Sequence, residues 1–432
     1  IQPLIDNDLG GAWRASAGAP TPGAQNSVYS LSVPPRLRQV RHTPKMPKAG
    51  QSATITVKAT DPEGVQEVKL FYQVVQPGNY IPAFLAKDTA TLLASPTNPL
   101  TPNPVYNDPT NWTEVAMVDD GMGEDRYTVT LPAQNNRVLV RYRIEAIDTL
   151  GDAVLVPYPD DASLNFAYFT YDGVPDYAVE DQTVQAGGVP YTYPSNVMTS
   201  LPVYFLVCDA ADFAQCFAYS GADQIPRNNF DARSAYNWTG TFIYEDVVYD
   251  NMKYRLRQRN GRYAGSGKRS LRYRFNKGHH AQFRDLEGRK YPRRWRTLNT
   301  HKCRGSRGQY NFGLAEISAA IMWNLFKVPS PDAHWMHLRV IKGPDEAPAG
   351  PDGQHLGDFF GYYQAMEEYD VRFLEAHDME KGNLYKLKST ITEGTEIQRY
   401  QAAYAVDDGS DYENLIFNRR PASTDAGLAQ RV

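Results

Sequence analysis

Two stretches near the middle of the sequence alternate basic and apolar residues, and a loop that contains glycines joins them. In the first, residues 253–259, every odd position is basic, and Tyr254 and Leu256 lie between the basic residues. The second, residues 268–275, follows a similar alternation. Because successive side chains of a strand point to opposite faces, the pattern predicts a hairpin with an apolar face on the core and a cationic face outward. The chemistry of such a face is the binding of anions.

The cationic face needs a neutralising partner, because like charges directly opposite one another across two strands are destabilising. The segment 253–307 holds 19 Lys and Arg against two acids, so it carries about +17 in a chain whose net charge is −4. This concentration indicates an anionic ligand or an acidic protein, rather than nucleic acid, as the partner of the region. The alternative is a solvated basic face whose charge is balanced by acids from elsewhere in the fold.

Spacing excludes several other kinds of site. Gly267-Lys268 fails the phosphate-loop pattern, because Arg262 stands where that pattern needs a glycine and Arg269 follows the lysine. No GxSxG sequence marks a hydrolase nucleophile. The three cysteines include no CxxC pair, so a zinc site is not indicated. Cys208 and Cys216 either form a disulfide or remain two half-buried thiols.

The length of 432 residues suits two or three domains. Residues 1–35 are rich in Gly, Ala, Pro and Ser and predict a flexible leader. Residues 36–172 alternate at period two between turn residues, apart from a Pro-rich insertion at 77–112, and resemble the immunoglobulin or fibronectin-III-like β-sandwiches of bacterial surface proteins. Residues 173–200 predict a linker. The predicted core positions of the sandwich are Val57, Leu70, Tyr72, Leu139, Tyr142 and Ile144.

A second unit is predicted over 201–432. Strands are expected at 201–207, 240–249, 252–259, 269–276, 334–341 and 358–366. A helix is expected over 313–326, because its apolar residues recur at helical spacing, and Pro329 and Pro331 end it. Those apolar residues are Leu314, Ile317, Ile321, Met322 and Leu325.

The order of these elements resembles the amino-terminal lobe of the CotH kinase family, an atypical group of secreted protein kinases. The order is a hairpin with a Gly-bearing loop, a strand lysine, a helix with a glutamate, and strands leading to a Glu-rich connection. The matching stretches cover about residues 201–390 and are Tyr254-Arg255-Leu256-Arg257 to Asn260-Gly261, residues 268–275, Leu298-Asn299-Thr300, Glu316 before Lys327-Val328-Pro329, residues 366–374, and Gly382-Asn383-Leu384-Tyr385-Lys386. The resemblance implies an α+β kinase-like lobe with an incomplete carboxy-terminal lobe.

The resemblance also implies a site for ATP and magnesium. Lys268 would neutralise phosphate charge, and Glu316 would orient it through an ion pair. The remaining nucleotide contacts would be Arg257, Asn260 and Gly261 in the loop, and Glu367 and Asp370 at the hinge between lobes. For Glu316 the alternative is an ordinary acid on a helix surface, and for Glu367 and Asp370 it is a capping role at the helix that follows them.

Two departures from the family limit what is expected of this chain. Gln258 follows Arg257 where family members have glycine, and the Trp-Asp-x-Asp-like motif that binds the metal does not occur before Val432. The sequence therefore predicts a secreted kinase-like protein that phosphorylates Ser or Thr of surface proteins only if a carboxy-terminal lobe exists. The alternative is a non-catalytic extracellular surface or matrix assembly protein. No apolar run approaches the ~20 residues of a membrane span, and a chain that begins at Ile1 is expected of a processed secreted protein.

Overall fold

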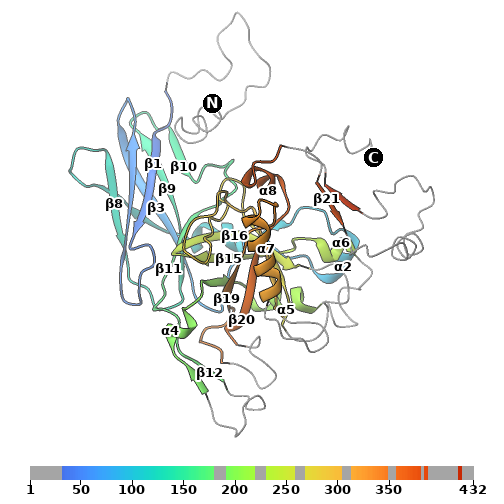
Figure 1. Ribbon diagram of the computed structural model, residues 1–432. Coiled ribbons are helices and arrows are strands. Elements are labelled where there is room, and N and C mark those ends of the chain that lie inside the picture. The colour runs from blue at the N-terminus through green and yellow to red at the C-terminus, as the bar shows by residue number, and fades with distance from the viewer. Residues whose placement is uncertain are drawn as a thin grey trace, which may run out of the picture.

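The computed structural model describes residues 32–179, 191–218, 230–257, 268–303, 313–348 and 357–380, and the backbone of two paired strands, β21 (Leu384–Leu387) and β22 (Phe417–Arg420). The described chain is mostly β. Figure 1 shows two β-rich units side by side, the first in blue and cyan and the second from green to orange.

The first unit consists of two antiparallel sheets that share one apolar core. One sheet has the order β1 (Arg36–Thr43), β2 (Ala53–Thr60), β8 (Arg126–Leu131), β7 (Val118–Asp119). The other has the order β10 (Ala153–Val156), β9 (Leu139–Asp148), β3 (Val65–Val75), β6 (Thr113–Ala116), and β11 (Phe166–Phe169) also pairs with β9. Burial alternates along β2, as period two requires.

The predicted core of the sandwich is confirmed for Val57, Leu70, Tyr142 and Ile144, which are buried between the two sheets. Tyr72 is only half-buried and packs against this core. Leu139 is buried too, but in a different cluster, where it meets residues of the second unit.

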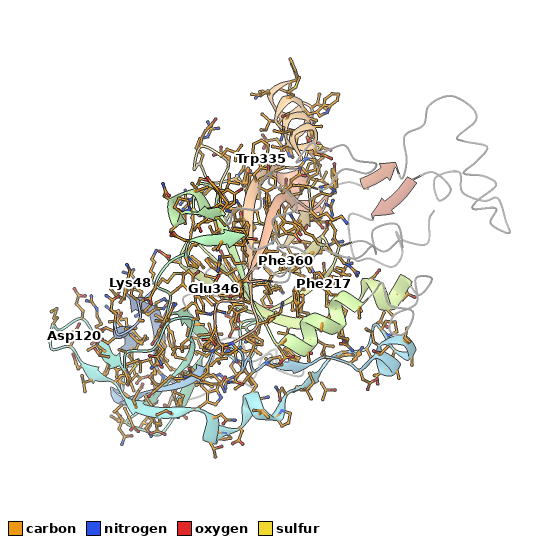
Figure 2. The ribbon with its side chains drawn as sticks, turned by 90° about the horizontal axis from the view of Figure 1, so that it is seen from below. Lys48, Asp120, Phe217, Trp335, Glu346 and Phe360 are labelled. Carbon is orange, nitrogen blue, oxygen red and sulfur yellow. The ribbon has the colours of Figure 1, made fainter. Side chains whose placement is uncertain are left out.

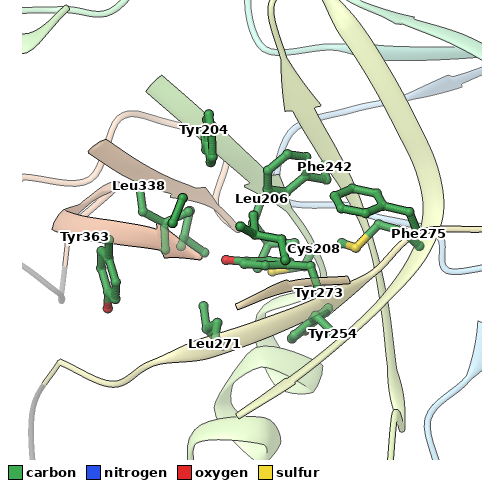
Figure 3. Close-up of a cluster of buried hydrophobic side chains, with 14 of the residues drawn as sticks. Tyr204, Leu206, Cys208, Phe242, Tyr254, Leu271, Tyr273, Phe275, Leu338 and Tyr363 are labelled. Atoms are coloured by element: carbon green, nitrogen blue, oxygen red, sulfur yellow. The ribbon is translucent and has the colours of Figure 1, made fainter. Parts of the chain in front are cut away.

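The second unit is a closed seven-stranded barrel. Its order is β14 (Val203–Val207), β15 (Trp238–Tyr244), β16 (Val247–Leu256), β17 (Leu271–Arg274), β18 (Thr297–His301), β20 (Phe359–Glu367), β19 (Ala333–Ile341). All neighbours are antiparallel except β14 and β19, whose parallel pairing closes the barrel. Figure 3 shows the apolar side chains that fill this unit. They include Tyr254, Leu271, Tyr273 and Phe275, so the predicted apolar face of the basic hairpin is confirmed.

Helices are a minor part of this unit, although the sequence predicts an α+β lobe. Among the described residues the helices beside the barrel are α5 (Ala210–Phe217), α6 (Phe230–Ser234), α7 (Leu314–Leu325) and α8 (Val371–Ala376). The physical reason is the closure of the sheet: β14 and β15 complete a barrel whose own side chains fill the interior, so helices are not needed to cover it. Cys208 and Cys216 are free thiols, both buried.

Helix α7 forms where the sequence predicts it, but most of its apolar residues are not covered by described residues. Only Ile317 is buried, whereas Leu314, Ile321, Met322 and Leu325 are exposed. In Figure 2 the pale orange helix stands out from the body of the molecule. Helical spacing predicts which side chains share a face, but it does not predict what lies against that face.

The segments between and within the units are more ordered than the sequence indicates. The segment expected to be a linker carries the paired strands β12 (Tyr177–Val179) and β13 (Tyr191–Tyr193) and the helix α4 (Ser195–Met198). Tyr177 and Met198 pack against Phe359 of the barrel. The insertion at 77–112 contains β4 (Phe84–Leu85), α2 (Thr89–Ala94), β5 (Thr101–Pro102), α3 (Pro104–Asn107) and the 3-10 turn η2 (Pro109–Asn111).

A buried ion pair joins the two units. Nε of Arg141 on β9 donates to Asp250 of β16 at 2.7 Å, and Nη2 donates to the other carboxylate oxygen at 3.2 Å. Arg141 is fully buried and Asp250 nearly so. Thr241, Asn165 and the backbone N–H of Asn251 also donate to Asp250, at 2.5, 2.9 and 2.8 Å. Burial would raise the pKa of Asp250, but Arg141 and these hydrogen bonds hold it below its ordinary value.

A second charged cluster lies along the same boundary. Arg137 donates to Glu346 at 3.0 Å and pairs with the buried Asp358 at 2.7 Å. Arg339 of β19 pairs with the other oxygen of Glu346. Around these pairs, apolar side chains from both units form one cluster, which includes Val75, Leu139 and Phe169 from the first unit and Phe205, Ile243 and Ile341 from the second. The units are therefore packed against each other through apolar contacts and buried ion pairs.

The ion pair gives the first prediction. Replacing Asp250 with Ala leaves Arg141 charged and buried, and we expect the free energy of unfolding to fall by about 3–5 kcal/mol. Because the pKa of Asp250 is depressed in the folded state, this difference should be present above about pH 4 and should shrink as the pH falls through the folded pKa. Urea unfolding at pH 7 and pH 3 measures both.

The matched control is Glu114→Ala, which removes a carboxylate from an exposed pair with Lys69 at 3.3 Å. Exposed ion pairs contribute little, so this variant should unfold at nearly the wild-type urea concentration. Equal losses for the two variants would show that the buried pair has no special role.

Candidate functional site

Three of the residues that sequence reasoning assigns to the nucleotide site, Arg257, Lys268 and Glu316, lie at one end of the barrel around His301. Arg257 follows the end of β16 and its backbone N–H donates to Ser270, which precedes β17, at 2.9 Å. His301 ends β18, and the N–H of Lys302 donates to the hydroxyl of Ser270 at 3.1 Å. Burial lowers the pKa of His301, the positive charge of Arg257 lowers it further, and Glu316 opposes this shift. Lys268 and Lys302 also lower it, so all four charged side chains act on one imidazole.

Lys268 does not pair with Glu316, so that expectation is corrected. Its ammonium group donates to the carbonyl oxygen of Tyr362 on β20, and Nζ lies 4.2 Å from the centre of the Tyr363 ring. Burial lowers the pKa of Lys268 to about 8. Glu316 lies in the first turn of α7. The charges of Lys268 and Glu316 both act on the thiol of Cys303. Burial raises the pKa of this thiol to about 11; Lys268 opposes the rise and Glu316 adds to it.

The rest of the expected nucleotide loop is only partly described. Nη1 of Arg257 donates to the carbonyl of Thr300 at 3.4 Å and lies 3.7 Å from the sulfur of Met366, so this side chain turns onto β18 and β20. Asn260 and Gly261 lie outside the described residues.

Two further residues belong to this end of the barrel, and sequence reasoning missed them. Lys302 follows β18 directly. Gln364 of β20 stands opposite His301 and is fully buried, yet neither its amide oxygen nor its amide nitrogen has a partner among the described residues. Buried polar groups are nearly always paired. A glutamine within an otherwise apolar strand is a weak signal, because it becomes informative only once its burial is known.

The acidic connection after β20 lies apart from Lys268. In the register of β18 and β20, Glu367 stands opposite Leu298 and Gln364 stands opposite His301. Three residues of β18, roughly 10 Å, therefore separate Glu367 from the end of the barrel at His301. Asp370 caps α8 by accepting from the N–H groups of Arg372 and Phe373, at 2.8 and 3.4 Å. The capping alternative therefore describes what Asp370 does in the structure.

Glu367 forms a close pair with Asp332. The N–H of Asp332 donates to Glu367 at 3.3 Å, and the other carboxylate oxygen of Glu367 has no partner among the described residues. Burial raises the pKa of Glu367 to about 8, and Asp332 adds to the rise. Burial also raises the pKa of Asp332, to about 6. Glu367 is therefore mostly protonated at neutral pH, which is unfavourable for a metal ligand.

The cationic face of the hairpin has the predicted like-charge pairs. Lys253 stands opposite Arg274, and Arg255 opposite Arg272. Glu368 forms an ion pair with Arg272, so an acid from elsewhere balances part of the charge. The guanidinium groups of Arg255 and Arg274 lie over the ring of Tyr236, at 4.9 and 5.5 Å from its centre. Lys253 and Arg274 also line a concave groove, so this face opens onto a concavity.

Comparisons with known proteins do not place the chain in a family. No family model matches it, and no curated protein matches it significantly. Within the described ranges, no group of three His, Cys, Asp or Glu residues is arranged to hold a metal ion. None of the described helices is long and apolar enough to cross a membrane.

The acidic pair gives the second prediction. A group whose pKa rises from 4.5 to about 8 on folding binds more protons in the folded state, so stability should fall as the pH rises between these values. Gln at position 367 keeps an acceptor for Asp332 but cannot ionise. At pH 8 we expect the free energy of unfolding of Glu367→Gln to exceed that of the wild type by on the order of 2 kcal/mol. At pH 5 the two free energies should differ less.

Urea unfolding at pH 5, 6.5 and 8 measures this difference. Asp332→Asn is the comparison, because its pKa rises only to about 6; this variant should change the slope mainly below pH 6.5. A Glu367→Gln slope equal to that of the wild type would show that Glu367 is already ionised at neutral pH.

Proposed function

We propose that this chain is the nucleotide-binding part of an extracellular kinase-like protein of the CotH type. The observation that carries the proposal is the convergence of Arg257, Lys268 and Lys302 at one end of the barrel, next to the buried amide of Gln364, which has no hydrogen-bond partner among the described residues. Clustered cations beside a buried amide suit a phosphate-bearing ligand, because charge-assisted hydrogen bonds to phosphate are the strong ones.

The order of elements supports the proposal. The hairpin β16–β17 carries the loop, β18 follows it and leads to Lys302, α7 carries Glu316 in its first turn, and β19 and β20 lead to the acidic connection. In kinases a Gly-bearing loop covers the phosphates, and a lysine of the third strand works with a glutamate of the next helix. Lys302, as well as Lys268, is therefore a candidate for that role.

Burial prepares Lys268 to receive an anion. Its charged form is destabilised by desolvation, so a phosphate oxygen in place of part of the missing solvent would stabilise the charge and raise the pKa again. Magnesium does not fit the described residues, since they hold no suitable cluster of ligands and Glu367 is mostly protonated at neutral pH. The proposal therefore covers nucleotide binding, and we derive no step of phosphoryl transfer.

The test is the binding of ATP to Lys268→Met, measured by titration calorimetry at low salt. We expect at least a tenfold loss of affinity, because a charge-assisted contact contributes about 1.5–3 kcal/mol. The variant should fold, since a part-buried ammonium group is replaced by an apolar side chain of similar length. Lys290→Met, which changes an exposed lysine of the same basic segment, is the control and should bind like the wild type.

Two outcomes would contradict the proposal. If Lys268→Met binds ATP as tightly as the wild type, the nucleotide does not bind at Lys268. A wild-type chain that binds no ATP would favour the non-catalytic role in surface or matrix assembly.

A further inference from the structure

A second cationic place lies outside the barrel, away from Lys268. It is a groove of about 970 Å³, bounded by residues 96–100 of the insertion, by α6, by β16 and β17, and by the start of α8. Figure 1 shows α2 of the insertion beside α6 on one side of the barrel. The basic residues that line the groove are Lys253, Arg274, Lys277, Arg296 and Arg372.

The charge of these five residues is not balanced locally. None of them forms an ion pair with another residue of the described chain, whereas Arg272, Arg284, Arg289 and Arg293 of the same segment do. Burial lowers the pKa of Lys253, and Arg274 lowers it further. Burial and Arg296 likewise lower the pKa of Arg274. At His280, on the wall of the groove, burial together with Arg372 and Arg296 lowers the pKa to about 4. A positive potential therefore fills the groove.

Three acids also line the groove, and two of them are engaged. Asp370 accepts the two N–H groups at the start of α8. Glu375 lies 3.9 Å from Arg293 in an ion pair. The third, Asp231, is exposed on α6. These acids leave an excess of positive charge in the groove.

The walls of the groove are held in place by contacts between the units. Nζ of Lys87 donates to the carbonyls of Ser95 and Asn98, each at 2.6 Å, and so fixes the segment that forms one wall. The backbone of Lys87 is in turn bound by the buried Asn237, which accepts from its N–H at 2.9 Å and donates to its carbonyl at 3.1 Å. On the other wall, Tyr236 supports Arg274. The groove is therefore preorganised, which lowers the cost of binding.

We infer that this groove binds a small ligand that carries two or more phosphate groups. Three arginines converge on one concavity, and the planar guanidinium group matches phosphate oxygens bidentately. The volume lies in the range of small-molecule sites. An extended acidic peptide would instead need cations spaced along an open track. The inference does not rest on the proposed nucleotide site, because none of the five cations of the groove belongs to that site.

The test is calorimetric titration of inorganic tripolyphosphate into the full chain. We use the Lys268→Met background, so that the end of the barrel does not contribute. Tripolyphosphate should bind with an affinity that falls as salt is added. Arg274→Gln with Arg296→Gln should weaken binding at least tenfold. Both side chains are exposed and lack ion pairs with described residues, so the fold should persist; Lys277→Gln offers an independent single change with a smaller loss.

Arg294→Gln is the matched control, since Arg294 is exposed in the same segment as Arg296 but does not line the groove. It should bind tripolyphosphate like its parent. Unchanged affinity in both the double variant and Lys277→Gln, or no binding by the parent, would overturn the inference. Polyglutamate that binds at least as tightly as tripolyphosphate would also overturn it, and would point to an acidic protein partner.

Discussion

Arg141 of the sandwich and Asp250 of the barrel form a buried ion pair between residues that are 109 positions apart in the sequence. Removing two charges from water is costly, and the cost is offset only when geometry and additional hydrogen bonds are good. Here the carboxylate accepts from Thr241, Asn165 and Asn251 as well as from Arg141. Such a network tolerates little displacement, so it fixes how the first unit sits on the second.

The cationic groove depends on this placement. Asp250 lies on β16, three residues before Lys253 on the same strand. The pair therefore sets the position of the strand whose outer face carries the cations of the groove. The insertion from the first unit supplies the opposite wall, and Lys87 with Asn237 fixes it to the barrel. Without the contact between units there would be a basic strand surface but no groove.

The two cationic sites differ in how far their charged groups are buried and in what those groups contact. At the end of the barrel, Lys268 is part-buried against a carbonyl and a tyrosine ring, and the buried amide of Gln364 finds no partner in the described part of the chain. In the groove, the cations are more exposed and repel one another across β16 and β17. The first arrangement favours a specific, partly desolvated contact with phosphate. The second favours attraction of a multivalent anion, and its affinity should respond more strongly to salt.

The sequence by itself determined the local elements. Period-two alternation predicted the inward-facing Tyr254, Leu271 and Tyr273, and helical spacing predicted α7 almost to its ends. Alternation did not predict β18, and the strand expected over 240–249 crosses the turn between β15 and β16. The sequence also predicted a cationic face on the basic hairpin, on which Lys253 and Arg274 line the groove. These features depend on residues close together in the chain, where side-chain direction follows from backbone geometry alone.

Only the tertiary structure decided how these elements combine. The parallel pairing of β14 with β19 closes the barrel, so the described chain is predominantly β where an α+β lobe is expected. Lys268 finds the carbonyl of Tyr362 in place of Glu316. The reason is that both outcomes join residues far apart in the chain: 94 positions separate Lys268 from Tyr362, and 134 separate Val203 from His337. Their pairing is chosen by the packing and charge balance of the whole molecule, which no local pattern contains.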